Sequence, residues 1–194
     1  MSKKEFEPQP WLFPCPTVLI GTVCDGKPNI ATYAWSGVGG GEPPVVTVAV
    51  RHQRHTLKGI YQNRAFSVNV PTEDFLVETD YCGTVSGRDT DKIKDCGFTV
   101  FYGTLKTTPL IEECPVNLEC EVMHILDVGL HALVVGKVIS TRVTGFCLTD
   151  GMPDISKIRP IIYSRGKPPR YNGIGKVIGE PFVTGKDMKK QPKK

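Results

Sequence analysis

The sequence lacks long apolar runs, and none approaches the roughly 20 residues that a membrane-spanning helix needs. Its N-terminal residues, MSKKEFEPQPW, carry charges but not the apolar core of a signal peptide. We therefore expect a soluble, cytoplasmic protein that does not associate with a membrane.

Motifs for metal binding and for nucleophilic catalysis are missing as well. The sequence has no C-x-x-C, HExxH, P-loop or nucleophile-elbow motif. The spacing of its seven cysteines fits neither a zinc ribbon nor an iron–sulfur cluster, so we expect no metal site. Without an export signal, we expect small buried thiols rather than a disulfide framework.

The net charge of the chain is also small. The formal net charge is +4, and much of it lies in the C-terminal tail from Lys186 to Lys194. Such a tail is typical of a solvated chain end rather than of a nucleic-acid arm. No basic helix or aromatic RNA-binding platform is present, so we expect no nucleic-acid partner.

The patterns that are present predict a mainly β, antiparallel barrel or sandwich with a few short helices. Asp25-Gly26 is a hairpin signal, Thr56 is a candidate N-cap of the first helix, and Val45–Val50, apolar on both faces, is a candidate central strand. In two strands, Ser67, Asn69, Asn117 and Glu119 are expected on an exposed face. We expect a domain over residues 14–164, an N-terminal extension over 1–13, and an extended arm with a basic tail over 165–194. The expected strands are Pro14–Val23, Pro28–Trp35, Val45–Val50, Ala65–Pro71, Val116–Asp127, His131–Val143 and Ile158–Tyr163, with helices at His55–Gln62 and Asp74–Cys82 and a turn at Gly151–Ser156.

One stretch, Asn29 to Thr56, indicates a ligand. Small residues at a strand end and the glycines Gly39 to Gly41 would let a flat ligand approach the backbone closely. The following strand leads to cationic residues and a hydroxyl at a helix start, which suit a phosphate. A flat ring joined to a phosphate describes FMN.

The same stretch resembles the flavin reductase-like, FMN-binding split-barrel family, and within it the flavoredoxin-type branch. The resemblance covers about Pro14 to about Tyr163 and implies a split β-barrel that binds FMN and forms a homodimer. The matching pieces are Asn29-x-Ala31-Thr32, Trp35-Ser36, Pro43-Pro44, His55-Thr56, Phe66 to Val70, Ser86 to Lys92, Gly129-Leu130-His131 and Val134 to Val138.

The resemblance assigns FMN contacts to two groups of residues. Hydrogen-bonding groups around the ring would tune its reduction potential. The alternatives are surface cations for the phosphate group and a core tryptophan for Trp35. Whether Arg51 or Arg88 is the principal ligand of the phosphate stays open. The expected phosphate group is Arg51, His55, Thr56, Ser86, Arg88 and Lys92, and the expected ring group is Asn29, Ala31, Thr32, Ala34, Trp35, Ser36, Thr47, Val48 and Ala49.

His131 is the candidate catalytic residue. Many family members have Gly-Asp-His at this place, and that His is associated with nicotinamide binding. Here Leu130 replaces the Asp, so the imidazole lacks that partner. The alternative is a histidine with a structural role only.

The resemblance implies an oxidoreductase in which NADH or NADPH reduces bound FMN, which then passes electrons to free flavin, ferric iron or a redox protein. The second hypothesis is a flavoredoxin-like electron carrier without direct NAD(P)H oxidation, which Leu130 favours. The third is a flavin-binding or sensing module without turnover.

Overall fold

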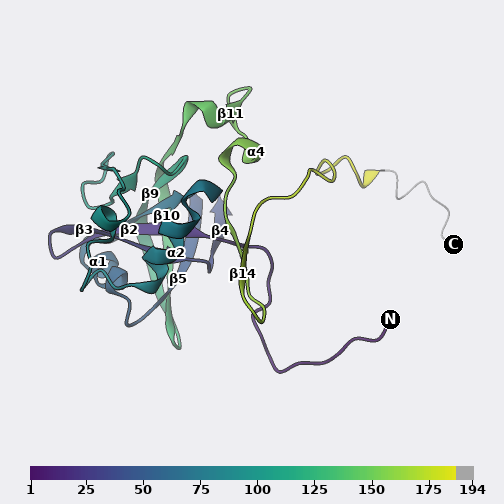
Figure 1. Cartoon of the computed structure of the whole chain (residues 1–194), viewed down its shortest axis with the longest axis horizontal. Coiled ribbons are helices and arrows are strands. Elements are labelled where there is room, and N and C mark those ends of the chain that lie inside the picture. The colour runs from purple at the N-terminus through teal and green to yellow at the C-terminus, as the bar shows by residue number, and fades with distance from the viewer. Residues whose placement is uncertain (187–194) are drawn as a thin grey trace.

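The structure is a computed structural model, and it describes residues 1–186 of the chain. Its main element is a seven-stranded antiparallel sheet in the order β3-β2-β6-β9-β10-β5-β4, which curves into a split barrel (Figure 1). The predicted mainly β, antiparallel class is therefore confirmed. The strands of this sheet are β2 (Val18–Cys24), β3 (Lys27–Tyr33), β4 (Ser36–Gly41), β5 (Pro44–Arg51), β6 (Ala65–Val70), β9 (Val116–Val128) and β10 (His131–Val143).

Short elements surround the barrel. β1 (Cys15–Pro16), β13 (Ile162–Ser164) and β14 (Arg170–Asn172) form a three-stranded sheet beside it. Two small hairpins pair β7 (Val100–Phe101) with β8 (Leu110–Ile111), and β11 (Leu148–Thr149) with β12 (Met152–Pro153). The helices are α1 (His55–Asn63), α2 (Leu76–Thr84), α3 (Lys92–Asp95) and α4 (Ile155–Ile158), with 3-10 turns η1 (Glu73–Phe75) and η2 (Gly145–Cys147).

Tight turns connect the longest hairpins. Asp25 and Gly26 have φ values of 51° and 78°, the left-handed conformation of a two-residue turn, so the predicted hairpin is confirmed. Gly129, with φ 73°, and Leu130 turn β9 back into β10. The first residue of β10 is therefore His131, opposite Val128.

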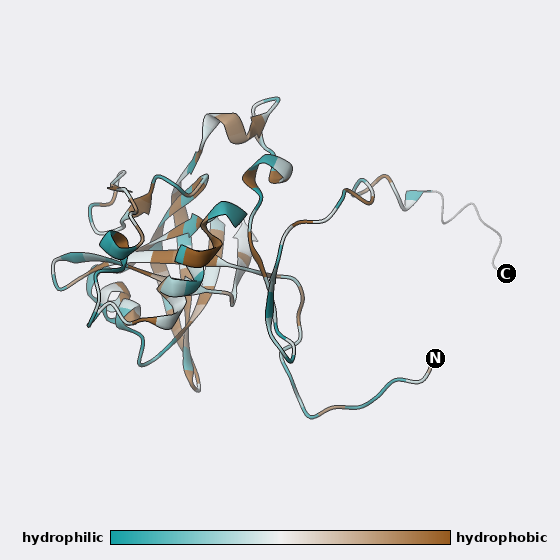
Figure 2. Cartoon of the chain, viewed as in Figure 1, coloured by the Kyte–Doolittle hydropathy of each residue, from teal (hydrophilic) through white to brown (hydrophobic). Residues whose placement is uncertain are grey.

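The hydrophobic core has two parts, one on each face of the sheet. Ile20, Phe66 and Val134 lie in the barrel interior. Leu19, whose side chain points the other way from that of Ile20, packs with Cys82 and the loops that cover the outer face. Buried hydrophobic residues therefore occur at successive positions of β2. Figure 2 shows that the barrel strands are largely hydrophobic, whereas many of the connecting loops are hydrophilic.

The expectation that Ser67, Asn69, Asn117 and Glu119 face solvent is wrong. These side chains are buried because the segment around β8 covers this face of the sheet. The Asn69 amide donates to the Leu19 carbonyl and to Ser67 Oγ at 3.2 and 3.1 Å. Its Oδ1 accepts from the Ile111 N–H and from Asn117 Nδ2 at 3.1 and 2.9 Å. Hydrogen bonds thus compensate for the burial of these polar groups.

The start of α1 differs from the prediction. Arg54, with extended φ −70° and ψ 133°, is the N-cap, and Thr56 is a buried residue inside the helix. The Thr56 hydroxyl accepts a hydrogen bond from Asn29 Nδ2 at 3.0 Å. Thr56 therefore joins α1 to β3 instead of capping the helix.

The glycine run has a structural role that the sequence reading missed. Gly39 to Gly41 belong to β4, the edge strand that pairs with β5. The predicted strand Val45–Val50 is confirmed as part of β5, which lies between β4 and β10 and next to the edge of the sheet rather than at its centre.

The region after β10 also differs from the prediction. The expected turn at Gly151–Ser156 contains β12 and the start of α4, and the expected strand Ile158–Tyr163 begins only at Ile162. Asp154 caps α4 by accepting from the Ser156 N–H at 2.9 Å, so a short helix forms first.

The described N-terminal and C-terminal segments both extend away from the barrel on the side of β14 (Figure 1). Within the predicted arm, β14 pairs with β13. The proposed division at residues 13 and 164 remains a prediction. Most of the predicted basic tail, residues 187–194, lies outside the described residues.

Gly59 of α1 provides a test of how closely this helix packs on β2. A Cβ at this position would lie 2.6 Å from the Val23 carbonyl oxygen and 2.7 Å from Cys24 Sγ. We expect Gly59→Ala to lower the free energy of unfolding by about 1–3 kcal/mol, because overpacking outweighs the helix propensity gained. Urea unfolding measures this change, and the exposed Gln62→Ala on the same helix is the control. Equal or greater stability of Gly59→Ala would contradict the packing.

Candidate functional site

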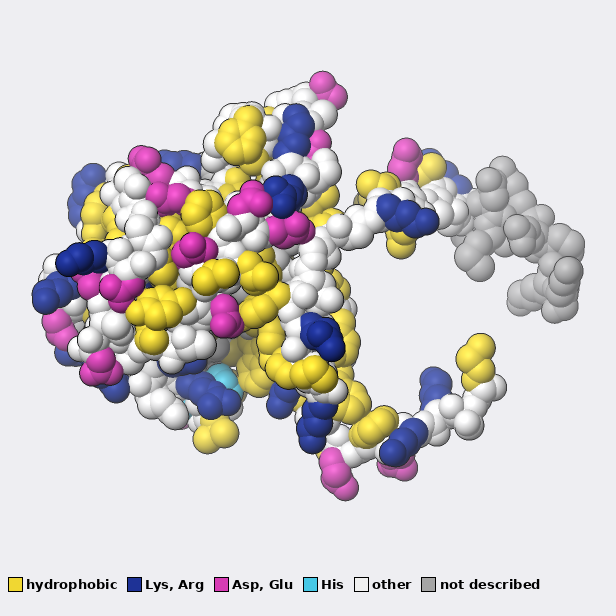
Figure 3. Space-filling view, in the orientation of Figure 1, with side chains coloured by type: hydrophobic (Ala, Val, Ile, Leu, Met, Phe, Trp, Pro, Cys, Tyr) yellow, Lys and Arg dark blue, Asp and Glu magenta, His cyan; other side chains and the backbone are white. Residues whose placement is uncertain are grey.

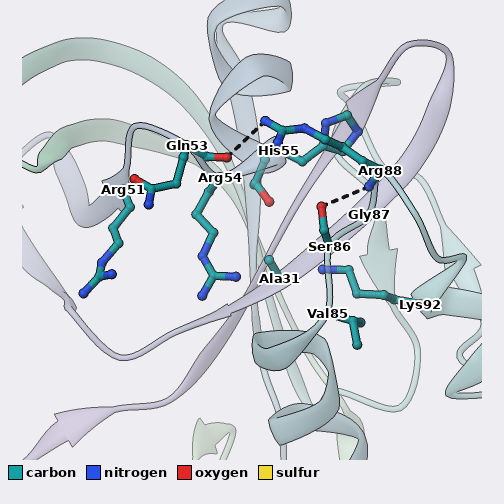
Figure 4. Close-up of a pocket in the computed structure, with 11 residues that line it drawn as sticks. Ala31, Arg51, Gln53, Arg54, His55, Val85, Ser86, Gly87, Arg88 and Lys92 are labelled. Atoms are coloured by element: carbon teal, nitrogen blue, oxygen red, sulfur yellow. Dashed lines mark hydrogen bonds between the residues drawn. The ribbon is translucent and has the colours of Figure 1, made fainter.

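Two adjoining cavities lie at one end of the barrel. We call the first, of about 320 Å³, the cationic cavity, and it lies between the start of α1 and the loop that joins α2 to α3. Figure 4 shows Arg51, Gln53, Arg54 and His55 on one side and Ser86, Arg88 and Lys92 on the other. The residues that line it are Ala31, Arg51, Gln53, Arg54, His55, Thr56, Val85, Ser86, Gly87, Arg88 and Lys92.

Hydrogen bonds between side chains and backbone join the two walls of the cationic cavity. Arg54 Nη2 donates to the Gly83 carbonyl at 3.1 Å, and Arg88 Nη2 donates to the Gln53 carbonyl at 3.0 Å. A Cβ on Gly87 would lie 1.9 Å from Asn29 Oδ1, so the loop can approach β3 this closely only with glycine here. The spacing of the two walls is thus fixed by the chain itself.

The cationic cavity is rich in positive charge that has no acidic partner within residues 1–186. Arg51, Arg54 and Arg88 form no salt bridge there, and no carboxylate lines the cavity. Lys92 is only 4% exposed, and its Nζ donates to the Cys82 carbonyl at 3.1 Å. Such unpaired cations attract an anion strongly.

Two titratable groups of this cavity have pKa values below their usual range. Burial lowers the pKa of Lys92 to about 8. Burial and then the neighbouring Arg88 lower the pKa of His55, which is therefore neutral at pH 7. His55 Nδ1 is buried without a hydrogen-bonding partner among the described residues. α1 also starts here without a side-chain cap, which leaves backbone N–H groups for an anion.

The second cavity, also about 320 Å³, shares Arg51 and Arg54 with the first, and we call it the aromatic cavity. The two cavities therefore adjoin, and together we call them the trough. The Ala49 N–H donates to the Trp35 carbonyl at 2.8 Å, which joins the chain after β3 to β5. The residues that line the aromatic cavity are Thr32, Tyr33, Ala34, Trp35, Ala49, Arg51, Arg54, His131, Tyr163 and Arg165.

His131 lies in the aromatic cavity, against the Trp35 ring. The two ring centroids are 4.9 Å apart with an interplanar angle of 39°. His131 is opposite Arg51 in the β10–β5 ladder. Burial, then the charges of Arg51 and His52, lower the pKa of His131, so its imidazole is neutral at pH 7.

The structure brings together most of the residues predicted to bind the ligand. Those that line the trough are Ala31, Thr32, Ala34, Trp35, Ala49, Arg51, His55, Thr56, Ser86, Arg88, Lys92 and His131.

Four predicted residues do not line the trough. Asn29 lies behind it and donates to Thr56, and Val48 is buried in the barrel core. Ser36, in β4, is opposite Val48, and Thr47 Oγ1 donates to the Gly37 carbonyl at 3.4 Å. The glycines Gly39 to Gly41 line neither cavity.

Sequence reasoning missed several residues of the trough. Arg54 lies in the cation-rich stretch before α1, so its position offered a signal. Tyr163 and Arg165 come from β13 and the turn after it, far along the chain, and only the tertiary fold brings them to the site. The missed residues are Tyr33, Gln53, Arg54, Val85, Gly87, Tyr163 and Arg165.

Residues 1–186 contain neither a cluster of metal-ligating side chains nor a membrane-spanning helix. No group of three His, Cys, Asp or Glu residues is placed to hold a metal ion. No helix in this range is both long and apolar enough to cross a membrane.

Comparison with known proteins identifies the family. The family model described as "Flavin reductase like domain" matches residues 12–168. The chain belongs to the flavin reductase-like family. This membership confirms the predicted family and the split-barrel fold.

Solved structures of family members agree. Flavoredoxin from Methanosarcina acetivorans is 35% identical with a TM-score of 0.91, and the match covers 96% of this chain and 99% of that one. Flavoredoxin of Desulfovibrio vulgaris is 30% identical with a TM-score of 0.89, over 95% of this chain and 100% of that one. An FMN-binding protein from Thermus thermophilus, 22% identical over 93% of this chain and 99% of that one, has a TM-score of 0.77 and shows the common fold.

The trough of this flavin reductase-like chain fits a flavin phosphate in its chemistry. Its cationic cavity offers unpaired cations and an uncapped helix start to a phosphate. Its aromatic cavity offers small side chains, Ala34 and Ala49, beside the Trp35 and His131 rings. Family membership and this donor set together support flavin-related electron transfer.

Proposed function

We propose that this protein binds FMN in the trough and passes electrons from NADH or NADPH, through FMN, to a second acceptor. The observation that carries the proposal is that a cationic cavity adjoins an aromatic one, with Arg51 and Arg54 lining both. FMN joins a phosphate to a flat ring in the same order. Bound FMN would supply the redox chemistry, because it accepts hydride and releases electrons singly or in pairs.

The protein would contribute binding and orientation. Arg51, Arg54, Arg88 and Lys92 would hold the phosphate, and the N–H groups at the start of α1 would donate to it. Thr56 would act indirectly, because its hydroxyl already accepts from Asn29.

The ring would lie in the aromatic cavity between β3 and β5. His131, neutral at pH 7 and packed against Trp35, would contact the ring or the nicotinamide that meets it. This position gives His131 a contact role without requiring it to transfer a proton.

A carrier without direct NAD(P)H oxidation is the alternative. Leu130, in place of the family's Asp, is 76% exposed and gives His131 no carboxylate partner from that position. The likeness to two flavoredoxins also favours a carrier. In this alternative a reduced redox protein, rather than NAD(P)H, supplies the electrons.

An anaerobic absorption experiment tests the proposal. We expect the purified protein, supplied with FMN, to show a bound-flavin spectrum that bleaches rapidly and saturably with NADH or NADPH. Bleaching by a reduced carrier protein alone would select the carrier. Failure to take up FMN would reject both functions, and flavin binding without electron flow from any donor would leave a sensing module.

We also propose that the protein is a cytoplasmic homodimer, as the family resemblance implies. Exposed apolar side chains near the turn of the β9–β10 hairpin support a contact surface between two protomers. They are Leu126, Val128 and Leu130. Light scattering coupled to size-exclusion chromatography measures the mass. A monomer near 21.3 kDa at micromolar concentration would contradict the dimer.

A further inference from the structure

Arg165 is a cationic residue of the trough. It lies outside the cavity proposed for the phosphate, and it forms no ion pair with a carboxylate within residues 1–186. It lines the aromatic cavity and a third cavity, which it shares with Glu7 and Trp11 of the N-terminal segment, and does not line the cationic cavity. Its guanidinium carbon lies 5.6 Å from the centroid of the Trp35 ring. It forms no salt bridge in the described part of the chain. Its charge is therefore available to a ligand.

Arg165 is held at this place by the β13–β14 hairpin. Arg165 directly follows β13, which pairs with both β1 and β14. Tyr171 of β14 anchors the hairpin to α2, because its hydroxyl donates to Asp80 Oδ1 at 2.7 Å. The Tyr163 and Tyr171 rings also pack at 5.9 Å between centroids. Figure 3 shows Lys and Arg side chains around the tip of this hairpin, on the exterior beside the barrel.

The trough holds more positive charge than a bound phosphate would neutralise. Arg51, Arg54, Arg88, Lys92 and Arg165 line the two cavities, which no Asp or Glu lines. A phosphate monoester carries about two negative charges at pH 7. About three of the five positive charges therefore stay unbalanced when FMN is bound, and Arg165 is the one that lines the aromatic cavity without lining the cationic cavity. A site with surplus positive charge attracts anions and repels cations.

We propose that Arg165 recognises the negative charge of the second substrate at the aromatic cavity, so that the substrate that meets the flavin ring is an anion. This inference rests on the proposed function and names the substrate class of the same site. The anion is the phosphate-bearing nicotinamide donor or an anionic acceptor, such as ferric iron chelated by carboxylates. Arg165 is a recognition residue: it attracts the substrate and takes no part in the chemistry.

The first test needs no flavin, because Trp35 itself reports on the cavity. The protein has two tryptophans, so Trp11→Phe leaves Trp35 as the only one. In this background at low salt, iodide should quench Trp35 fluorescence more strongly than caesium does. Arg165→Gln should lower the iodide quenching constant about two- to fivefold. Neutral acrylamide should quench both proteins equally, since its access depends on exposure and not on charge.

The second test uses the FMN-loaded protein, reduced with dithionite and mixed with acceptors of different charge. Each reduced site releases two electrons and two protons, which reduce two ferricyanide ions, with the protons going to solvent, or one benzoquinone, which takes up both protons. Arg165→Gln should slow reoxidation by ferricyanide about five- to tenfold and leave benzoquinone unchanged. Added salt should slow the wild-type reaction with ferricyanide more than that of the variant.

A third measurement distinguishes the two sources of the anion. Slower bleaching of the variant by NADH or NADPH identifies the nicotinamide donor, and slower reoxidation by ferric citrate identifies an acceptor. Lys176→Gln removes the same charge from an exposed position farther along the arm and should change none of these rates.

The failures can be told apart. A protein that takes up no FMN would reject the proposed function and, with it, the substrate assignment. A protein that binds FMN, but in which Arg165→Gln changes neither iodide quenching nor the preference for ferricyanide, would reject only the role of Arg165. Equal effects of Arg165→Gln and Lys176→Gln would also reject it, since they would reflect overall charge.

Discussion

Replacing Lys92 with methionine should raise the dissociation constant of FMN about 10- to 100-fold. The reason is the loss of one charge-assisted hydrogen bond to the proposed phosphate, worth about 1.5–3 kcal/mol. Methionine fills a similar volume, so the buried position stays packed. Fluorescence titration with FMN measures the affinity. Lys94→Met, on the exposed side of α3, is the matched control and should bind FMN as the wild type does.

The pH dependence of FMN binding offers a second check on Lys92. Because burial lowers the pKa of Lys92 to about 8, the wild-type affinity should fall as pH rises through that value. Lys92→Met should have a flatter profile between pH 7 and 9.5. In the FMN-free protein, Lys92 should contribute the opposite trend, seen in the difference in free energy of unfolding between the wild type and Lys92→Met. Above pH 8 the folded wild type has lost a proton that its unfolded state keeps up to about pH 10.4, so this difference shifts in favour of the wild type as pH rises.

An unchanged FMN affinity in Lys92→Met would remove this lysine from the phosphate site. A wild-type affinity that is constant from pH 7 to 9.5, with an intact fold, would do the same.

Replacing Glu119 with alanine should lower the free energy of unfolding by about 3–5 kcal/mol, the range for breaking a buried ion pair. The Glu119 side chain has no exposed surface, and its carboxylate accepts from Arg142 Nη1 at 2.6 Å. It also accepts from the Leu105 and Thr104 N–H groups at 2.8 and 3.1 Å. Alanine would leave these donors without an acceptor. Urea unfolding at pH 7 measures the change.

Glutamine at position 119 is the informative control, because it keeps an acceptor oxygen and removes the charge. We expect Glu119→Gln to be destabilised less than Glu119→Ala. Burial raises the pKa of Glu119, but hydrogen bonds from Leu105, Arg142 and Thr104 together outweigh it, and the net pKa is below 4.5. The stability from the ionised carboxylate is thus complete above pH 4.5 and is lost as pH falls through the lowered pKa.

The wild type and Glu119→Gln should therefore converge in stability in acid. Alanine and glutamine variants that are both as stable as the wild type at pH 7 would mean that Glu119 does not hold the loop before β8.

Local signals in the sequence were sufficient for most of the barrel. The Asp25-Gly26 turn, the apolar run in β5 and the span of β10 each follow from neighbouring residues. The burial of Asn69 and Glu119 could not be predicted in this way, because the residues that cover them lie in β8 and in the loop before it, 42 and 14 positions away in the sequence. Periodicity along a strand shows which side chains share a face and does not show what covers that face.

The residues of the candidate site likewise divide into those that local sequence signals predicted and those that they could not predict. The cationic residues near α1 and in the loop before α3 come from two contiguous stretches, and their composition indicated an anion. The aromatic cavity takes Arg165 from the end of the chain, where the sequence predicted only an extended arm. A single residue that comes from a distant segment has no local sequence pattern from which its place in the site could be predicted. The sequence motifs that predicted the family end near Tyr163, and they gave no signal for Arg165.

The pairing of β5 with β10 also has a consequence for synthesis of the protein. Arg51 at the end of β5 pairs with His131 at the start of β10. One edge of β5 therefore stays unpaired until a strand 80 residues later in the sequence has been synthesised. Until then, the growing chain carries a strand of mostly β-branched residues whose one paired neighbour is the glycine-rich β4. Unpaired apolar strands are prone to associate with other chains. The nascent protein should therefore depend most on chaperones, and be most sensitive to slow translation, between the emergence of β5 and that of β10.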